Sequence, residues 1–102
     1  MHQERFYEIG AQFADAQRRK VFGHEAFTVN RKPFIFLEGD ELVCKLNGRY
    51  DAEAFAMAGV HFFAPMGPDK PMKNWVAIPF TYEDQWIEWA LRAYEVLMEE
   101  IG

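Results

Sequence analysis

The chain contains a single cysteine among its 102 residues. One cysteine forms no intramolecular disulfide and supplies no cysteine-based metal cage. The three histidines, His2, His24 and His61, show no metal-ligand spacing such as H-x-x-x-H. The sequence therefore predicts neither a structural metal nor a cofactor, and the scarcity of cysteine favours a reducing compartment.

Long apolar runs and an excess of positive charge are also missing. No apolar run approaches the roughly 20 residues that span a bilayer, and residues Met1 to Arg5 lack the pattern of a secretory signal peptide. We therefore expect a cytoplasmic protein without membrane contact. Eleven Lys and Arg against sixteen Asp and Glu give a formal net charge of −5. This charge repels a phosphate backbone and disfavours nucleic acid as a partner.

Aromatic side chains are abundant instead. Half of the residues are hydrophobic and 17% are aromatic, with ten Phe and three Trp. Burial of each large apolar group contributes about 1.5 to 3 kcal/mol, so this composition excludes disorder and predicts one folded domain over residues 1–102. Because a small domain has a high surface-to-volume ratio, we also expect apolar surface beyond what one copy buries, and hence self-association.

The stretch from Lys20 to Leu46 has the pattern of three antiparallel strands joined by two tight turns. Apolar residues alternate up to Val29, crowd over 34–37 and alternate again over 42–46, whereas Asn30-Arg31 and Glu38-Gly39-Asp40 have turn composition. The sequence predicts a meander here.

Helical periodicity flanks this meander. One amphipathic helix is predicted from Glu4 to about Arg18, and Arg18-Arg19-Lys20 are expected to close it. Gly10 lies inside this helix, where it either permits close approach to the sheet or is merely tolerated. A short helix over 52–58 with Asp51 as N-cap and Phe55 as anchor follows, then strands over 60–64 and 72–78. The last helix carries an apolar stripe of Trp86, Ile87, Ala90, Leu91, Tyr94, Leu97, Met98 and Ile101.

These elements predict an α+β, two-layer domain with a five-stranded antiparallel sheet, helices on one face and the order α-β-β-β-α-β-β-α. Three motifs, Val21-Phe22-Gly23, the 34–46 strand pair and Trp75 to Pro79, together resemble the TfoX N-terminal domain, here as a stand-alone domain. The resemblance covers about Arg19 to Val96 and implies a secretion-chaperone-like fold and a bacterial regulatory role linked to competence. A more distant similarity to the YjbR group implies a nucleic-acid-associated regulator.

A thiol and base pair is the one catalytic pattern the residue types permit, from Cys44 with His24 or His61. Cys44 shares its predicted face with Leu42 and Leu46, which favours an inert buried thiol. We therefore predict no catalytic residue and no enzymatic activity.

A second apolar face emerges from the strand alternation. Val43, Phe63, Trp75 and Ala77 are predicted to lie opposite the core face, and His61 shares the side of Phe63. Helices on one face leave this side without a cover, so the leading hypothesis is a non-enzymatic homodimeric interaction or regulatory domain that uses these residues as its interface.

Two other functions stay open. Beside the 65–71 loop, His61, Phe63 and Trp75 have the composition of an aromatic small-ligand pocket with a polar handle. The third hypothesis is the nucleic-acid-associated regulator, which the acidic charge and the absence of a predicted recognition helix disfavour.

Overall fold

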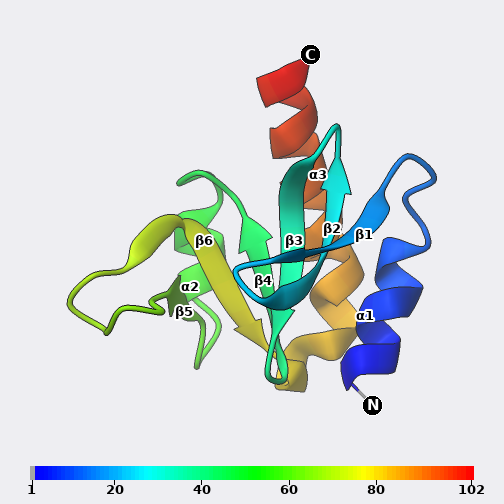
Figure 1. The fold of residues 1–102 in the computed structure, drawn as a ribbon. Coiled ribbons are helices and arrows are strands. Elements are labelled where there is room, and N and C mark those ends of the chain that lie inside the picture. Colours follow the sequence, from blue (N-terminus) through cyan, green and yellow to red (C-terminus); the bar gives the residue numbers. More distant parts are fainter. Residues whose placement is uncertain (1) are drawn as a thin grey trace.

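The computed structural model describes residues 2–102, which form an α+β domain (Figure 1). All strands belong to one antiparallel sheet in the order β1-β2-β3-β4-β6-β5. The elements are α1 (His2–Gly10), β1 (Gln17–Val21), β2 (His24–Val29), β3 (Lys32–Glu38), β4 (Glu41–Lys45), α2 (Asp51–Phe55), β5 (His61–Phe63), β6 (Met72–Pro79), the 3₁₀ helix η1 (Phe80–Gln85) and α3 (Trp86–Ile101).

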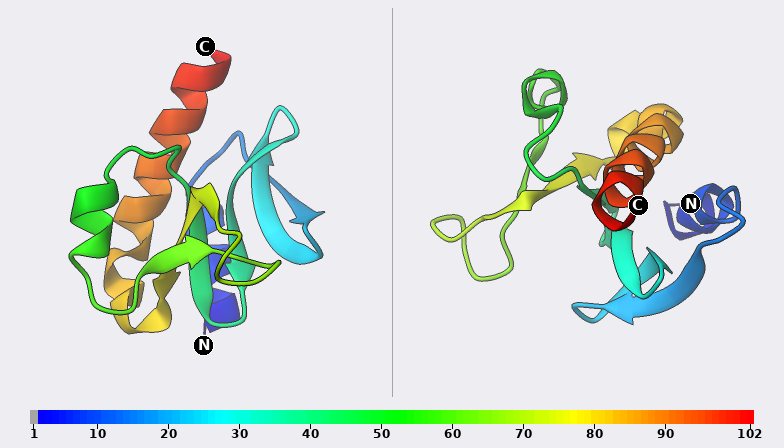
Figure 2. Two further views of the ribbon diagram at one scale, coloured as in Figure 1. Left: turned by 90° about the vertical axis from the view of Figure 1, so that its left-hand side faces the viewer. Right: turned by 90° about the horizontal axis from the view of Figure 1, so that it is seen from above.

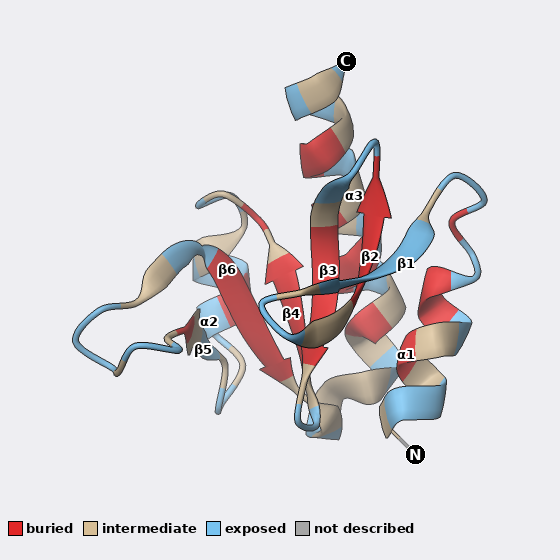
Figure 3. Ribbon diagram, viewed as in Figure 1, coloured by how far each residue is buried: buried red, intermediate tan, exposed pale blue. Residues whose placement is uncertain are grey.

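Two hydrophobic clusters lie on opposite faces of the sheet. The larger one unites the helices with the strands and contains Phe6 of α1, Ala54 of α2 and Trp86 of α3; α1 and α3 lie side by side over the central strands (Figure 2). The smaller cluster contains strand residues only, namely Ala26, Phe36, Val43, Phe63, Trp75 and Ala77. Burial on both faces explains the continuous buried stretches of β2, β3, β4 and β6 in Figure 3.

The sheet has six strands, so the prediction of five is wrong. The segment expected as one strand before Asn30 is the hairpin β1–β2, which turns at Phe22 and Gly23 with φ of 55° and 78°. Two-residue hairpin turns of this kind favour Asn, Asp or Gly at the first position. Phenylalanine there gives no turn signal, which is why the sequence pattern concealed the hairpin.

The first helix ends at Gly10 rather than near Arg18. A Cβ on Gly10 would lie 1.9 Å from the Phe27 ring, which confirms that this glycine permits close approach to the sheet. The chain then proceeds through turns to β1, so Arg18 to Lys20 belong to an edge strand and do not close a helix. Phe13 still reaches the core and is 7% exposed, so its helical spacing was misleading.

The two later helices also differ locally from expectation. Asp51 is the first residue of α2, and the N-cap is Tyr50, with a φ of 65°. Ala54 is the residue of α2 that is buried in the core, whereas Phe55 is 39% exposed and packs against the ring of Phe62. In α3 the buried stripe is Trp86, Trp89, Ala90, Ala93, Val96 and Leu97. Leu91, predicted to be buried, is 48% exposed, because α3 packs on β3 and β4 through a side rotated away from this residue.

Candidate functional site

The smaller cluster defines a surface that we call the aromatic face: Ala26, Phe36, Val43, Phe63, Trp75 and Ala77, with the ring of Phe22 above them. Neighbouring strands are about 4.8 Å apart, so a flat sheet would hold the β1–β2 hairpin roughly 14 Å from β6. The rings of Phe22 and Trp75 nevertheless have centroids 6.1 Å apart. The sheet therefore curls, and the β1–β2 hairpin crosses in front of β3 (Figure 1).

Phe36 lies at the centre of this face. Its ring centroid is 4.9 Å from Phe63, 5.0 Å from Trp75 and 5.6 Å from Phe22. The imidazole of His24 stacks on the same ring at 5.4 Å with an interplanar angle of 11°. Aromatic pairs contribute about 0.5 to 1.5 kcal/mol each beyond the area that they bury. The aromatic face is therefore a second small core.

The structure brings the predicted surface residues together but buries four of them within one chain. Val43, Phe63, Trp75 and Ala77 all belong to the aromatic face and are 0 to 5% exposed. His61 pairs with Ala77 across β5 and β6 and is exposed. The alternation of these strands was predicted correctly. The expectation that this side lies open in a single chain is wrong, because the curled β1–β2 hairpin covers it.

Phe22 is the apolar residue of this face that stays open to solvent, and sequence reasoning missed it. Its side chain is 53% exposed while its ring contacts Phe36, Phe63 and Trp75. The left-handed backbone of a bulky residue costs about 1 to 2 kcal/mol. The Phe22-Gly23 dipeptide was the available signal, since glycine often marks a tight turn.

Two histidine–glutamate pairs line the rim of the aromatic face at the β3–β4 turn. His24 Nε2 lies 3.8 Å from a Glu38 carboxylate oxygen, and His61 Nε2 lies 2.9 Å from Glu41 Oε1. Glu38 and Glu41 are cross-strand partners. Partial burial lowers the pKa of His61, but hydrogen bonds to the Phe62 carbonyl and to Glu41 outweigh it and leave the pKa raised. The rim is thus polar and charged around an apolar centre.

Cys44 lies on the other face of the sheet. It is fully buried in the main core, with Ile35 and Val76 as cross-strand partners, and burial raises the pKa of its thiol. Because His24 and His61 belong to the aromatic side, the structure forms no thiol–imidazole pair. Within residues 2–102 there is no group of three or more His, Cys, Asp or Glu side chains placed to hold a metal ion. None of the described helices is long and apolar enough to cross a membrane.

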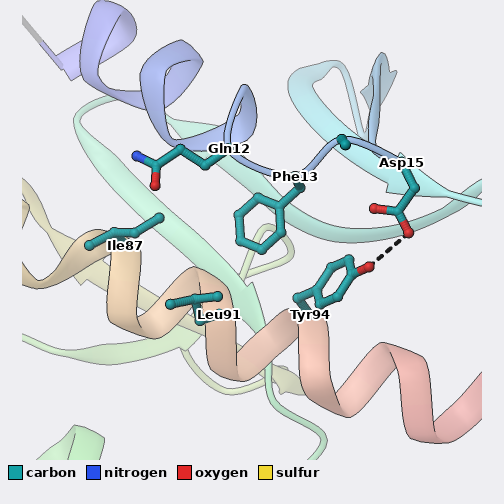
Figure 4. A pocket seen from close by; sticks show the side chains of 7 residues that line it. Gln12, Phe13, Asp15, Ile87, Leu91 and Tyr94 are labelled. Carbon is teal, nitrogen blue, oxygen red and sulfur yellow. Dashed lines mark hydrogen bonds between the residues drawn. The ribbon is translucent and has the colours of Figure 1, made fainter.

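Two shallow grooves lie on the helix side, one on each side of the loop that joins α1 to β1. The first has a volume of about 420 Å³, and the Tyr94 hydroxyl donates a hydrogen bond of 2.7 Å to Asp15 at its end (Figure 4). Its walls are Gln12, Phe13, Ala14, Asp15, Ile87, Leu91 and Tyr94. The second, of about 490 Å³, includes Tyr7, Phe13, Arg18 and Phe27. The predicted ligand wall of His61, Phe63 and Trp75 lines neither groove.

Two of the three motifs on which the TfoX resemblance was based meet on the aromatic face, where the ring of Phe22 contacts that of Trp75. Such contacts follow from hydrophobic burial in many folds, and a fold does not by itself imply a function. The chemistry of the exposed side chains is therefore the basis on which a function can be assigned. Comparisons of the chain with protein-family models, with curated proteins and with solved structures found no match.

Proposed function

We propose that this chain is a non-enzymatic interaction domain that forms a homodimer through the aromatic face, with Phe22 at the centre of the contact. The observation that supports this proposal is that Phe22 is 53% exposed while its ring packs against the buried rings of Phe36 and Trp75. Rigid aromatic anchors of this type dominate the energy of protein interfaces. In an isologous contact the two-fold axis brings the same residue of both copies together.

The exposed part of Phe22 sets the expected strength. About half of a phenylalanine surface of roughly 200 Å² is on the order of 100 Å², which contributes about 2.5 kcal/mol per copy on burial. Two copies contribute about 5 kcal/mol, against an association cost of roughly 4 kcal/mol or more. Val21 and Met72, both half-buried beside the cluster, add further apolar area. A weak dimer with a Kd on the order of 100 μM corresponds to about 5.5 kcal/mol, so these residues and the rest of the contact would have to supply about 4.5 kcal/mol beyond the two Phe22 rings.

The rim supports the same assignment. Glu38 lies 3.8 Å from His24 and Glu41 lies 2.9 Å from His61, so the apolar centre is surrounded by polar groups that contact one another within one chain. Interfaces commonly have an apolar core and a polar rim that stays solvated. A dimer contact centred on Phe22 leaves these carboxylates at the solvated rim.

The regulatory and cytoplasmic parts of the proposal have separate support. The regulatory role is proposed on the TfoX resemblance, which rests on Val21-Phe22-Gly23, the 34–46 strand pair and Trp75 to Pro79. The cytoplasmic location is proposed because a single cysteine, the buried and free Cys44, is compatible with a reducing compartment.

Sedimentation velocity over a range from about 5 to about 500 μM tests the dimer. We expect the wild-type mass to rise with concentration toward two chains and Phe22→Ala to remain monomeric. Phe22→Gly removes the ring and also relieves the positive φ, so it guards against misfolding of the hairpin. Leu91→Ala is the matched control, because Leu91 is similarly exposed but lies on α3. A wild-type monomer throughout the range, or a dimer lost only with Leu91→Ala, contradicts the proposal.

Small-ligand binding is a second candidate, now at the first groove. Apolar walls from Phe13, Ile87 and Leu91 surround an acceptor, the Asp15 carboxylate, which Tyr94 holds in place. This combination fits a small aromatic molecule with one hydrogen-bond donor. Indole is a suitable probe, and we expect its addition to shift the NMR signals of Phe13 and Tyr94 in the wild type but not in Leu91→Glu. Unchanged spectra at millimolar indole would rule out this candidate.

A further inference from the structure

No strand of the described residues, 2–102, pairs with the outer edge of β1. Strand β1 is the first in the sheet order, and Gln17 to Lys20 are all exposed (Figure 3). Val21 faces His24 across the two-residue turn, so alternate residues of β1 bond to β2. The N–H and C=O groups of Arg18 and Lys20 consequently point away from the sheet. An extended polypeptide meets such groups at every second residue.

Positive charge is concentrated on this edge, although the chain as a whole is acidic. Arg18 forms a 3.0 Å ion pair with Glu25 on the neighbouring strand. Arg19 donates a hydrogen bond to Gln17 and Lys20 points to solvent; neither forms an ion pair with an acid among residues 2–102. Charges further away than about 8 to 10 Å are screened at physiological salt, so these local cations decide what approaches the edge.

The residues around β1 hold it in place without covering its charge. The Arg18 guanidinium lies 4.1 Å above the Tyr7 ring, and the Tyr7 hydroxyl donates to Glu25. Arg18 and then Tyr7 are the main reasons why the pKa of Glu25 is lowered, with a smaller contribution from Lys20. Asp15, the acid just before the strand, accepts its hydrogen bond from Tyr94.

An apolar recess accompanies the edge. The second groove, of about 490 Å³, lies between the loop after α1 and the first two strands, with Tyr7, Phe13 and Phe27 in its walls and Arg18 at its margin. Arg18 pairs with Phe27 in the β1–β2 register, so both side chains lie on the helix side of the sheet. A strand added next to β1 directs every second side chain to this same side.

We propose that the β1 edge binds an extended acidic segment of a partner protein by strand addition, with its carboxylates on Arg19 and Lys20 and an apolar side chain in the second groove. This surface is separate from the aromatic face, and the inference does not depend on the homodimer.

Two alternative occupants fit the edge less well. A second copy of β1 in antiparallel register would place Arg18, Arg19 and Lys20 opposite cations of the same strand, and like charges across a strand pair are destabilising. A nucleic acid would use the cations but would leave the outward backbone donors and acceptors of β1 without strand partners. The alternation of backbone groups with positive side chains therefore favours an acidic polypeptide.

The test uses the full chain and two synthetic peptides, one with glutamates on both faces of the strand and a single valine on one face, and one in which lysines replace the glutamates. We expect the acidic peptide to bind with a Kd of about 10 to 500 μM by NMR titration and the basic peptide to show no binding. The amide protons of Arg18 and Lys20 should exchange more slowly in the complex, since both gain strand partners. Failure of the acidic peptide to bind, or protection elsewhere only, overturns the inference.

Two variants at one position separate the backbone from the charge. Lys20→Gln removes the charge and is expected to reduce the affinity for the acidic peptide by about three- to fivefold. Lys20→Pro also removes an outward N–H that β2 does not use, so the fold is retained while binding falls by about tenfold or more. Equal affinities of these two variants overturn strand addition. Tighter binding of a single-stranded oligonucleotide than of the peptide would assign the edge to nucleic acid, and concentration-dependent protection of Lys20 without peptide would assign it to a second copy.

Discussion

Replacing Gly10 with alanine tests the contact between α1 and the sheet. Helix propensity alone favours alanine over glycine by about 1 kcal/mol, and the sequence left open whether this glycine is merely tolerated. In the structure the added Cβ would lie 1.9, 2.0 and 2.4 Å from three carbons of the Phe27 ring. That ring cannot simply move aside, since it is 5% exposed and packs against Phe6 with centroids 5.1 Å apart.

The expected net effect of Gly10→Ala is therefore destabilisation. Overpacking of a filled core costs about 1 to 3 kcal/mol, and three close carbon contacts place this site near the upper limit. After subtraction of the gain in helix propensity, we expect a loss of about 2 kcal/mol in the free energy of unfolding. At roughly 4 to 8 °C per kcal/mol for a domain of this size, Tm should fall by about 8 to 16 °C.

Urea denaturation followed by far-UV circular dichroism measures this loss, and a double-mutant cycle assigns its cause. Phe27→Leu removes the ring atoms that meet the new Cβ, so Gly10→Ala added to Phe27→Leu should cost less than about 1 kcal/mol. A stabilised or unchanged Gly10→Ala protein would refute the close packing of α1 on β2. An equal cost with and without the Phe27 ring would refute the assigned cause.

Three further outcomes are expected. Glu41→Gln should lower the pKa of His61 in an NMR titration, because the carboxylate helps to raise it. A histidine whose pKa is raised in the folded state stabilises the protein below its unfolded pKa of about 6.5, and this stabilisation is lost as pH rises through the folded pKa. The wild type should therefore lose a little stability from about pH 6.5 upward, and Glu41→Gln should lose less. A His61 pKa that does not change in Glu41→Gln would contradict the pairing. Tyr94→Phe should cost about 0.5 to 1 kcal/mol by removing the bond to Asp15, with faster amide exchange in the loop after α1; unchanged exchange there would show that the bond does not hold this loop. Cys44 should resist Ellman's reagent until the protein unfolds, because its thiol is buried and its pKa is raised; rapid labelling of native protein would contradict its place in the core.

The strand alternation was readable from the sequence. A period of two assigns successive side chains to opposite faces, and in β6 it correctly separated Val76 from Trp75, which belong to different clusters. In β5 it likewise separated Phe62 from Phe63. The α+β class and the antiparallel pairing followed from the same local information.

The candidate site was only partly readable. Strand alternation identified Trp75 and Phe63 as residues of a second apolar face, whereas Phe22 was missed because a phenylalanine rarely occupies the first position of a tight hairpin turn. The exposure of β1 was missed for a related reason: Phe13 and Ala16 continued the helical period of α1, although they reach the core from turns. The basic edge of the sheet was therefore mistaken for the end of a helix.

Which side chains share a face depends on the local geometry of each strand, so the order of residues alone carries this information. The extent to which the sheet curls, and hence which of those side chains meet solvent, depends on contacts between distant strands. The contact of Phe22 with Trp75 joins residues more than fifty positions apart, and only the accumulated twist of the three strand pairings between the hairpin and β6 brings them together. That curvature buries the aromatic face and leaves one phenylalanine open on it, while the strand order places β1 at the free edge.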